Sequence, residues 1–221
     1  TATKDRSYRL RNLTLNRIDM RRDNIKTAFE PVVLEMAEHD PNRVVKGKAI
    51  ELLGGLKNPA YKSLFAKATA DSSYTVSGNA LSALAEIDSA QAVEIAKRLV
   101  KEPAKGDLTV AIAGVLIKAG DESDFDAISD NFENMQVGQA KFNFSLSYAN
   151  MLSKVSNMDK LKRGVDLLIQ FKEAIPSAFR GQTDPVFNNE LQGLAKKKEA
   201  AGMKDQADYI TSRLASEKKG F

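Results

Sequence analysis

The chain has 221 residues, 43% of them hydrophobic, so it can bury a substantial core in one domain or one array of repeats. Its 33 basic and 29 acidic side chains leave a net charge of +4, milder than the concentrated basic face of a typical nucleic-acid-binding protein. It contains no cysteine, which excludes disulfides and thiolate zinc sites, and no run approaches the ~20 apolar residues of a membrane span. We therefore expect no nucleic acid and no membrane as partners, whereas the compartment stays open.

Residues 1–24 show neither a clean helical period nor a clean alternation of apolar residues. Their charges are mostly basic, and we interpret them as a frayed or partly helical lead-in with a solvated surface. The chain starts at Thr1 rather than at methionine, which is typical of a processed chain or of a piece of a longer protein. No basic stretch followed by an apolar core opens it, so we expect no secretory signal at this end.

From Ile25 onward, apolar residues recur with a helical period, and one pattern occurs twice at an offset of 31 residues (45 to 76). The matched pairs are Val45 and Val76, Gly47 and Gly78, Ala49 and Ala80, and Leu53 and Leu84. Self-similarity at a period of roughly 20–50 residues is the mark of stacked repeats. We therefore predict pairs of helices that bury their apolar stripes by stacking on one another.

The second helix of each pair repeats at the same spacing, with Val33, Leu64 and Ile95 at equivalent positions. A third inner helix is predicted over residues 108–119, where apolar residues again mark one face. The small residues on the inner helices should let neighbouring backbones approach closely.

A fourth helix pair is predicted over residues 125–132 and 142–155. After Asn157 the repeat fades while helical stripes continue, as in the atypical end units of solenoids. The sequence thus predicts an all-α fold: an α-solenoid of HEAT-like helix pairs with about eleven helices. It should form one domain over residues 25–221, with irregular capping helices at its C-terminal end.

Several helix ends can be located from capping residues. We expect N-caps at Asp40, Asn58, Asp88, Ser123 and Asp184, the first, second and last of which precede a proline. Gly54 and Gly55 lie near the end of an inner helix, where glycine can adopt the left-handed cap conformation.

The chain has a single histidine, His39, which limits the catalytic chemistry it can perform. An H-E-x-x-H zinc site needs two histidines on one helical face, and a Ser-His-Asp triad would need a serine motif near His39. Neither is present, so we expect His39 to have a local role at a helix C-terminus. The sequence assigns no catalytic residue.

The acidic turn after Gly120 suggests a possible calcium site. Positions 1, 3, 5 and 12 of an EF-hand loop would be Glu122, Asp124, Asp126 and Glu133. Position 6, which needs glycine, is Ala127. We therefore favour a helix start, in which Ser123 is the cap and the acids meet the positive end of the helix dipole.

The strongest basic clusters are residues 196–198 and Lys218-Lys219, and we expect the first, on a helix beyond Leu194, to point to solvent. The pairs Gly54-Gly55 and Gly120-Asp121 fit neither glycine-rich phosphate motif. The sequence therefore assigns no metal-binding and no cofactor-binding residue in this chain.

Three segments resemble the C-terminal helical domain of aminopeptidase-N-type zinc aminopeptidases. They are Asp40-Pro-Asn-Arg-Val-Val with the residues that follow it, Ala70-Asp-Ser-Ser-Tyr-Thr-Val, and the turn Gly120-Asp-Glu-Ser-Asp-Phe. The likeness covers roughly residues 25–214. It implies a parent enzyme that removes N-terminal residues from peptides with one zinc ion, held in a separate catalytic domain that this chain lacks.

In that family the C-terminal solenoid packs on the catalytic domain and encloses the peptide chamber. The resemblance therefore implies two partners, the catalytic domain of the same parent chain and a peptide substrate at the concave face. No catalytic residue of the family maps onto any position here. Two other classes stay open: an independent HEAT-like protein-binding scaffold, and a HEAT-like DNA-binding protein, against which the absence of tryptophan and the mild charge count.

Overall fold

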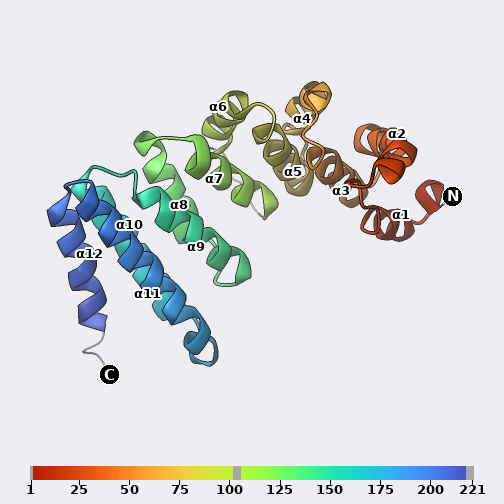
Figure 1. Ribbon diagram of the computed structural model, residues 1–221. Helices are drawn as coiled ribbons and strands as arrows, with labels where there is room; N and C mark the ends of the chain where they lie inside the picture. The colour runs from red at the N-terminus through yellow and green to blue at the C-terminus, as the bar shows by residue number, and fades with distance from the viewer. Residues whose placement is uncertain (1, 102–105, 218–221) are drawn as a thin grey trace. The chain divides into compact units, whose positions relative to one another are not determined.

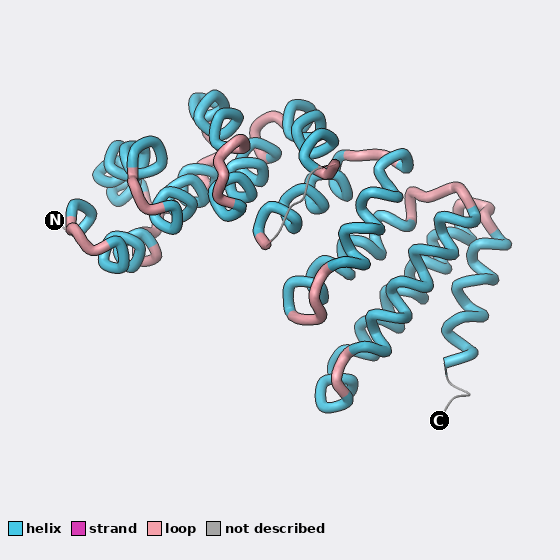
Figure 2. Tube along the Cα trace, turned by 180° about the vertical axis from the view of Figure 1, so that it is seen from behind, coloured by secondary structure: helices cyan, strands magenta, loops and turns pink. Residues whose placement is uncertain are grey.

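The computed structural model describes residues 2–101 and 106–217, and this part of the chain is helical throughout, with no strand (Figures 1 and 2). Its α-helices are α1 (Tyr8–Leu15), α2 (Asp23–His39), α3 (Arg43–Gly54), α4 (Lys62–Ala68), α5 (Tyr74–Ala85), α6 (Ser89–Leu99), α7 (Asp107–Ala119), α8 (Phe125–Asn134), α9 (Gln139–Leu152), α10 (Met158–Ala174), α11 (Ser177–Ala200) and α12 (Lys204–Glu217). Short 3-10 turns precede α1 (Ala2–Lys4), α4 (Pro59–Tyr61) and α8 (Glu122–Asp124). The predicted all-α fold of HEAT-like helix pairs is confirmed.

The chain divides into two compact units, Thr1–Ala119 and Gly120–Phe221, rather than into a lead-in and one domain over residues 25–221. The lead-in is partly helical, which is one of the two expected forms, but its surface is not wholly solvated, because α1 packs against α3. Arg11 and Leu15 are both buried on that side of α1. Residues 1–24 therefore contribute the first inner helix of the array.

In the first unit, the inner helices α1, α3, α5 and α7 stack in order, and α2, α4 and α6 pack on them from one side (Figure 1). The predicted close approach of neighbouring backbones is present. A Cβ atom on Gly78 would lie 2.6 Å from the carbonyl carbon of Asp107, and one on Gly47 would lie 3.0 Å from Cγ2 of Thr75. At the equivalent position of α7 stands Val110, which is 40% exposed.

Three helix starts differ from the expected ones. The N-cap of α3 is Asn42, whose side chain accepts hydrogen bonds from two backbone N–H groups, whereas Asp40 ends α2. Asp121, and not Ser123, caps the turn that leads into α8. Pro185 lies inside the 24-residue α11 rather than at its start. The expected caps at Asn58 and Asp88 are confirmed.

The prediction of a left-handed glycine at Gly54-Gly55 is also wrong. Gly55 is right-handed, with φ −60°, and the left-handed residue of this turn is Lys57, with φ 50°. Gly54 is needed for another reason, since a Cβ atom there would lie 2.7 Å from the Cβ of Ala83 on α5. The second glycine leaves the surface between α3 and α5 open.

The second unit is built from longer helices around an aromatic core. Its ring contacts join Phe125, Phe132, Phe144, Tyr148, Phe171 and Phe187, with centroid separations between 4.8 and 6.5 Å. The Tyr148 hydroxyl lies 2.7 Å from the Ser129 hydroxyl, and burial raises the pKa of Tyr148. Burying the aromatic rings in offset and edge-on pairs fixes how α8, α9 and α10 meet.

Candidate functional site

One side of the inner helices of the first unit is left uncovered, and we call it the inner-helix face. Its residues recur three or four positions apart on α3, α5 and α7, which places them on one side of each helix. They are exposed or half-exposed: Val44, Lys48, Glu51, Thr75, Asn79, Ser82, Glu86, Asp107, Val110, Gly114 and Lys118. The face is polar, and its side chains are mostly small or charged.

Hydrogen bonds along the inner-helix face join one helix to the next. Thr75 Oγ1 on α5 donates to Asp107 Oδ2 on α7 at 2.7 Å, and Asn79 Nδ2 donates to the backbone oxygen of Gly47 on α3 at 3.0 Å. Because each link spans two neighbouring repeats, the polar side chains of this face also hold the stacking in register.

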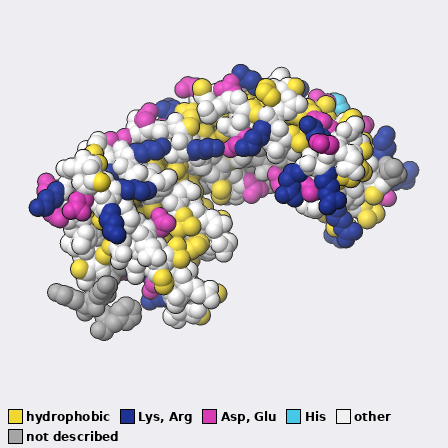
Figure 3. Space-filling view, viewed as in Figure 1, with side chains coloured by type: hydrophobic (Ala, Val, Ile, Leu, Met, Phe, Trp, Pro, Cys, Tyr) yellow, Lys and Arg dark blue, Asp and Glu magenta, His cyan; other side chains and the backbone are white. Residues whose placement is uncertain are grey.

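Glu86 is the charged centre of this face. Lys57 Nζ lies 2.5 Å from one of its carboxylate oxygens and Lys118 Nζ lies 2.9 Å from the other. Hydrogen bonds from Lys57 and Lys118 lower the pKa of Glu86 to about 2. Acids and bases therefore offset one another along the face, and in Figure 3 the two kinds of side chain are intermixed over the first unit.

A shallow groove of about 220 Å³ opens between α3 and α5 at the end of the inner-helix face. Gly54, Gly55, Ser82 and Ala83 line it with little more than backbone and single small groups, and Glu86 stands at its edge. It is smaller than the ~300–1,000 Å³ of ordinary small-molecule sites. The groove has room for one side chain of a bound peptide or protein.

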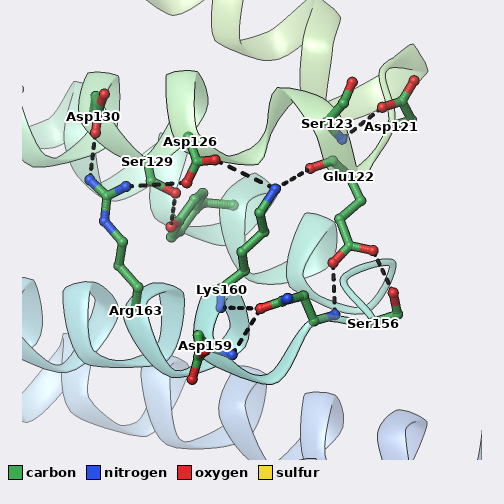
Figure 4. Close-up of polar contacts among 12 residues, drawn as sticks. Asp121, Glu122, Ser123, Asp126, Ser129, Asp130, Ser156, Asp159, Lys160 and Arg163 are labelled. Carbon is green, nitrogen blue, oxygen red and sulfur yellow. Dashed lines mark hydrogen bonds and ion pairs between the residues drawn. The ribbon is translucent and has the colours of Figure 1, made fainter.

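The four carboxylates of the calcium hypothesis bind protein groups instead, as Figure 4 shows for Glu122 and Asp126. Glu122 accepts hydrogen bonds from Ser156 Oγ at 2.6 Å and from the Asn157 backbone at 2.8 Å, and Asp124 accepts one from the Asp121 backbone at 3.0 Å. These hydrogen bonds fix the turn at the start of α8. A helix start is the interpretation that we favoured from the sequence.

Asp126 and Glu133 instead point at cations of α10. Arg163 pairs with Asp126 at 3.5 Å and with Glu133 at 3.3 Å, and Lys160 lies 3.5 Å from Asp126. Within residues 2–101 and 106–217, no group of three or more acidic or histidine side chains is placed to hold a metal ion. The acidic turn therefore links α8 to α10 by ion pairs.

His39 and the lysine cluster are not among the residues of the inner-helix face. The His39 side chain is 76% exposed, beside Glu38 at the end of α2. Lys196 and Lys197 are exposed as expected, but the expectation for Lys198 is wrong, since it is fully buried. The other basic pair, Lys218-Lys219, lies outside the described residues.

The Lys198 ammonium group donates to the backbone oxygens of Ser153, at 3.2 Å, and of Val155. Lys141 does the same for α8, donating to the oxygens of Glu133 and Met135 at 3.2 and 3.1 Å. Burial lowers the pKa of both lysines. Each ammonium group satisfies carbonyls that a helix end leaves without partners.

A cavity of about 690 Å³ runs between α11 and α12 in the second unit. Its charged lining residues are Lys172, Asp184, Lys196, Glu199, Lys204 and Asp208. Cations and anions are balanced in this lining, so the cavity favours neither sign of ligand charge. Its volume alone lies in the range of ligand sites.

Comparison with known proteins gives one match. A family model for HEAT repeats matches residues 30–117. The matched stretch lies within the first unit, from the middle of α2 to α7, and the chain is a helical-repeat scaffold of the HEAT-like type. No curated protein and no solved structure matches the chain. None of the helices in the described part is both long and apolar enough to cross a bilayer.

Sequence reasoning missed the charged centre of the inner-helix face. Gly55, Glu86 and Lys118 occupy equivalent positions of three successive repeats, at offsets of 31 and 32 residues. Comparing the charges at equivalent positions, and not only the apolar residues, would have shown that Glu86 faces Lys118. Its second partner, Lys57, lies in a turn and gives no such signal.

Proposed function

We propose that this chain is the non-catalytic C-terminal helical domain of a zinc aminopeptidase, which packs on the catalytic domain and encloses the peptide chamber. The observation that carries the proposal is the polar, charge-balanced inner-helix face on HEAT-like repeats. The resemblance of residues 40–53 and 70–84 to that family supplies the parent enzyme. Zinc belongs to the separate catalytic domain.

The chemistry of the inner-helix face suits a chamber wall. Such a wall meets many different peptides and must release each of them, so it should lack a large apolar patch that would hold one sequence. Ser82 and Gly114 have little or no side chain to protrude from the face, and the charge of Glu86 is offset by Lys57 and Lys118. Peptides can therefore pass along it without a strong preference.

The second candidate is an independent protein-binding scaffold, which the HEAT match supports by itself. Such a scaffold would use the same repeat array, but its partner would stay bound in the groove beside Gly55 and Ser82, whereas a peptide substrate would move along the face. A DNA-binding role is less favoured, because Glu51, Glu86 and Asp107 offset the lysines of the inner-helix face and leave no basic stripe.

Ser82→Trp, made in the longer protein that contains the catalytic domain, tests the chamber wall. We expect the bulky ring to lower kcat/KM for long peptides several-fold while hydrolysis of a short aminoacyl-arylamide is unchanged, because only long substrates would reach the wall. Glu94→Trp, on the exposed side of the outer helix α6, is the matched control and should change neither rate. Equal effects of Ser82→Trp on both substrates would contradict the proposal.

A further inference from the structure

Helix α1 is covered on one side only. Its buried residues are Arg11, which makes two 2.8 Å hydrogen bonds to the Asp40 carboxylate, and Leu15. Leu10 and Leu13 lie three residues apart on the opposite side of the helix, and they are 45% and 48% exposed. We call the surface around these two leucines the α1 face.

The α1 face is apolar where the exposed side of a helix is usually polar. In α1 the uncovered positions 10 and 13 carry leucine. A pair of leucines on one side of α1 is a surface that a further protein element would cover.

Positive charge surrounds this surface. Lys4, Arg6 and Arg17 are exposed and make no ion pair with a described residue. The nearby acid Asp19 is already neutralised by Arg21, at 2.7 Å, and by Arg22. Figure 3 shows hydrophobic side chains beside Lys and Arg side chains at this end of the first unit.

We propose that the α1 face docks a protein segment whose apolar side chains are flanked by carboxylates. Leu10 and Leu13 would supply the apolar centre, and Arg6 and Arg17, which precede and follow α1 in the sequence, would pair with the flanking acids. A second copy of this chain is disfavoured, because it would bring two basic surfaces together. That the segment belongs to the catalytic domain rests on the proposed function; the docking surface itself does not.

The test uses the 221-residue chain and three synthetic amphipathic helical peptides as probes. The first has a leucine stripe flanked by glutamates, the second has the same stripe flanked by lysines, and the third keeps the glutamates but replaces the leucines by alanine. Binding is measured by fluorescence anisotropy at low and high salt. We expect the first peptide to bind at least about tenfold more tightly than either other peptide, and more weakly as salt rises.

Two double variants separate the contributions. Leu10→Asp with Leu13→Asp should abolish binding of the first peptide, and Arg6→Glu with Arg17→Glu should remove its preference over the lysine-flanked one. All four side chains are exposed, so the fold should be retained, which circular dichroism checks. The control is Val137→Asp with Phe179→Asp, two exposed apolar residues of the second unit that should leave binding unchanged.

Three results would overturn the proposal: no binding of the first peptide, equal binding of the lysine-flanked peptide, or undiminished binding by the leucine variant. Sedimentation showing a dimer that Leu10→Asp with Leu13→Asp dissociates would assign the surface to a second copy instead. None of these outcomes depends on an aminopeptidase parent. A gene without a catalytic domain would refute the proposed function and leave the docking surface standing.

Discussion

The two units of the chain solve the same packing problem by different means. In the first unit, neighbouring inner helices meet through glycine, so that Gly78 lies against the backbone of Asp107 and Gly47 lies against the side chain of Thr75. In the second, the helices are held apart by aromatic rings such as Phe132 and Tyr148, 4.8 Å between centroids, and tied at their ends by buried lysines. Close packing at glycine can recur in every repeat of a chain, whereas a core built from particular aromatic rings fits only one position in the fold.

The difference explains why the family model for HEAT repeats stops at residue 117. A repeat remains visible in a sequence when the same small residues recur at a fixed spacing. An aromatic core depends on the particular rings that fill it, and its members need not recur. We expect the largest effects of substitution in the second unit, where single side chains fill most of the core.

Phe132→Ala should have the largest effect. Phe132 is fully buried and touches three other rings of the aromatic core, so we expect a loss of about 3–5 kcal/mol in the free energy of unfolding. Urea titration followed by circular dichroism measures it. A loss as small as that of a surface substitution would mean that the core tolerates a cavity there.

Lys198→Met tests the buried lysine of the second unit. Removing the ammonium group leaves the oxygens of Ser153 and Val155 without this donor, which should cost about 1–3 kcal/mol. Lys196→Met, two residues earlier and exposed, should cost less than about 0.5 kcal/mol in the same titration.

The pH dependence of Lys198→Met gives an independent check. Because burial lowers the pKa of Lys198, the folded protein binds this proton less tightly than the unfolded chain does. Wild-type stability should therefore gain from this group as the pH rises toward its ordinary pKa of 10.5, and Lys198→Met should lose that gain. Identical pH profiles for the two proteins would show that the ammonium group is not buried in solution.

Gly78→Ala tests the close stacking of the first unit. The added methyl group would press on the backbone of Asp107, so we expect a loss of about 1–3 kcal/mol although alanine is the better helix former. Gly114→Ala, on α7 with nothing within 4 Å of the added carbon, should gain about 0.5–1 kcal/mol. Stabilisation by both substitutions would show that the helices of the first unit do not stack backbone to backbone.

Glu86→Gln should have the smallest effect, at most about 1 kcal/mol near pH 7, because its two ion pairs are partly exposed. The pKa of Glu86 is about 2 in the folded protein against an ordinary 4.5, so its contribution is complete above pH 4.5 and is lost as the pH falls toward 2. The difference between wild type and variant should follow that course in thermal unfolding. It should also shrink in high salt.

Much of the first unit could be predicted from the sequence, because its packing depends on residues that recur. Gly47 and Gly78 gave both the spacing and the close approach. The first inner helix was missed because Leu10 and Leu13 face outward, which breaks the period expected for a buried stripe. Arg11 was expected in solvent with the other basic residues of this segment, because its partner Asp40 lies 29 positions away in the sequence.

The second unit was predicted less well. The aromatic residues were recognised as apolar stripes, but their ring contacts join α8, α9, α10 and α11 in a way that no sequence period gives. Lys198 was expected in solvent from its neighbours Lys196 and Lys197, yet the acceptors that bury it lie more than 40 positions earlier in the chain. Long-range partners of this kind are outside the reach of a local pattern.

Peptidase activity is the most direct test of the proposal that this chain is the non-catalytic domain of a zinc aminopeptidase. The purified 221-residue chain should release no amino acid from an aminoacyl-arylamide with zinc added, whereas the longer product of the same reading frame should do so and lose the activity to a chelator. Zinc-dependent hydrolysis by the 221-residue chain alone, or a longer product without any such activity, would contradict the assignment.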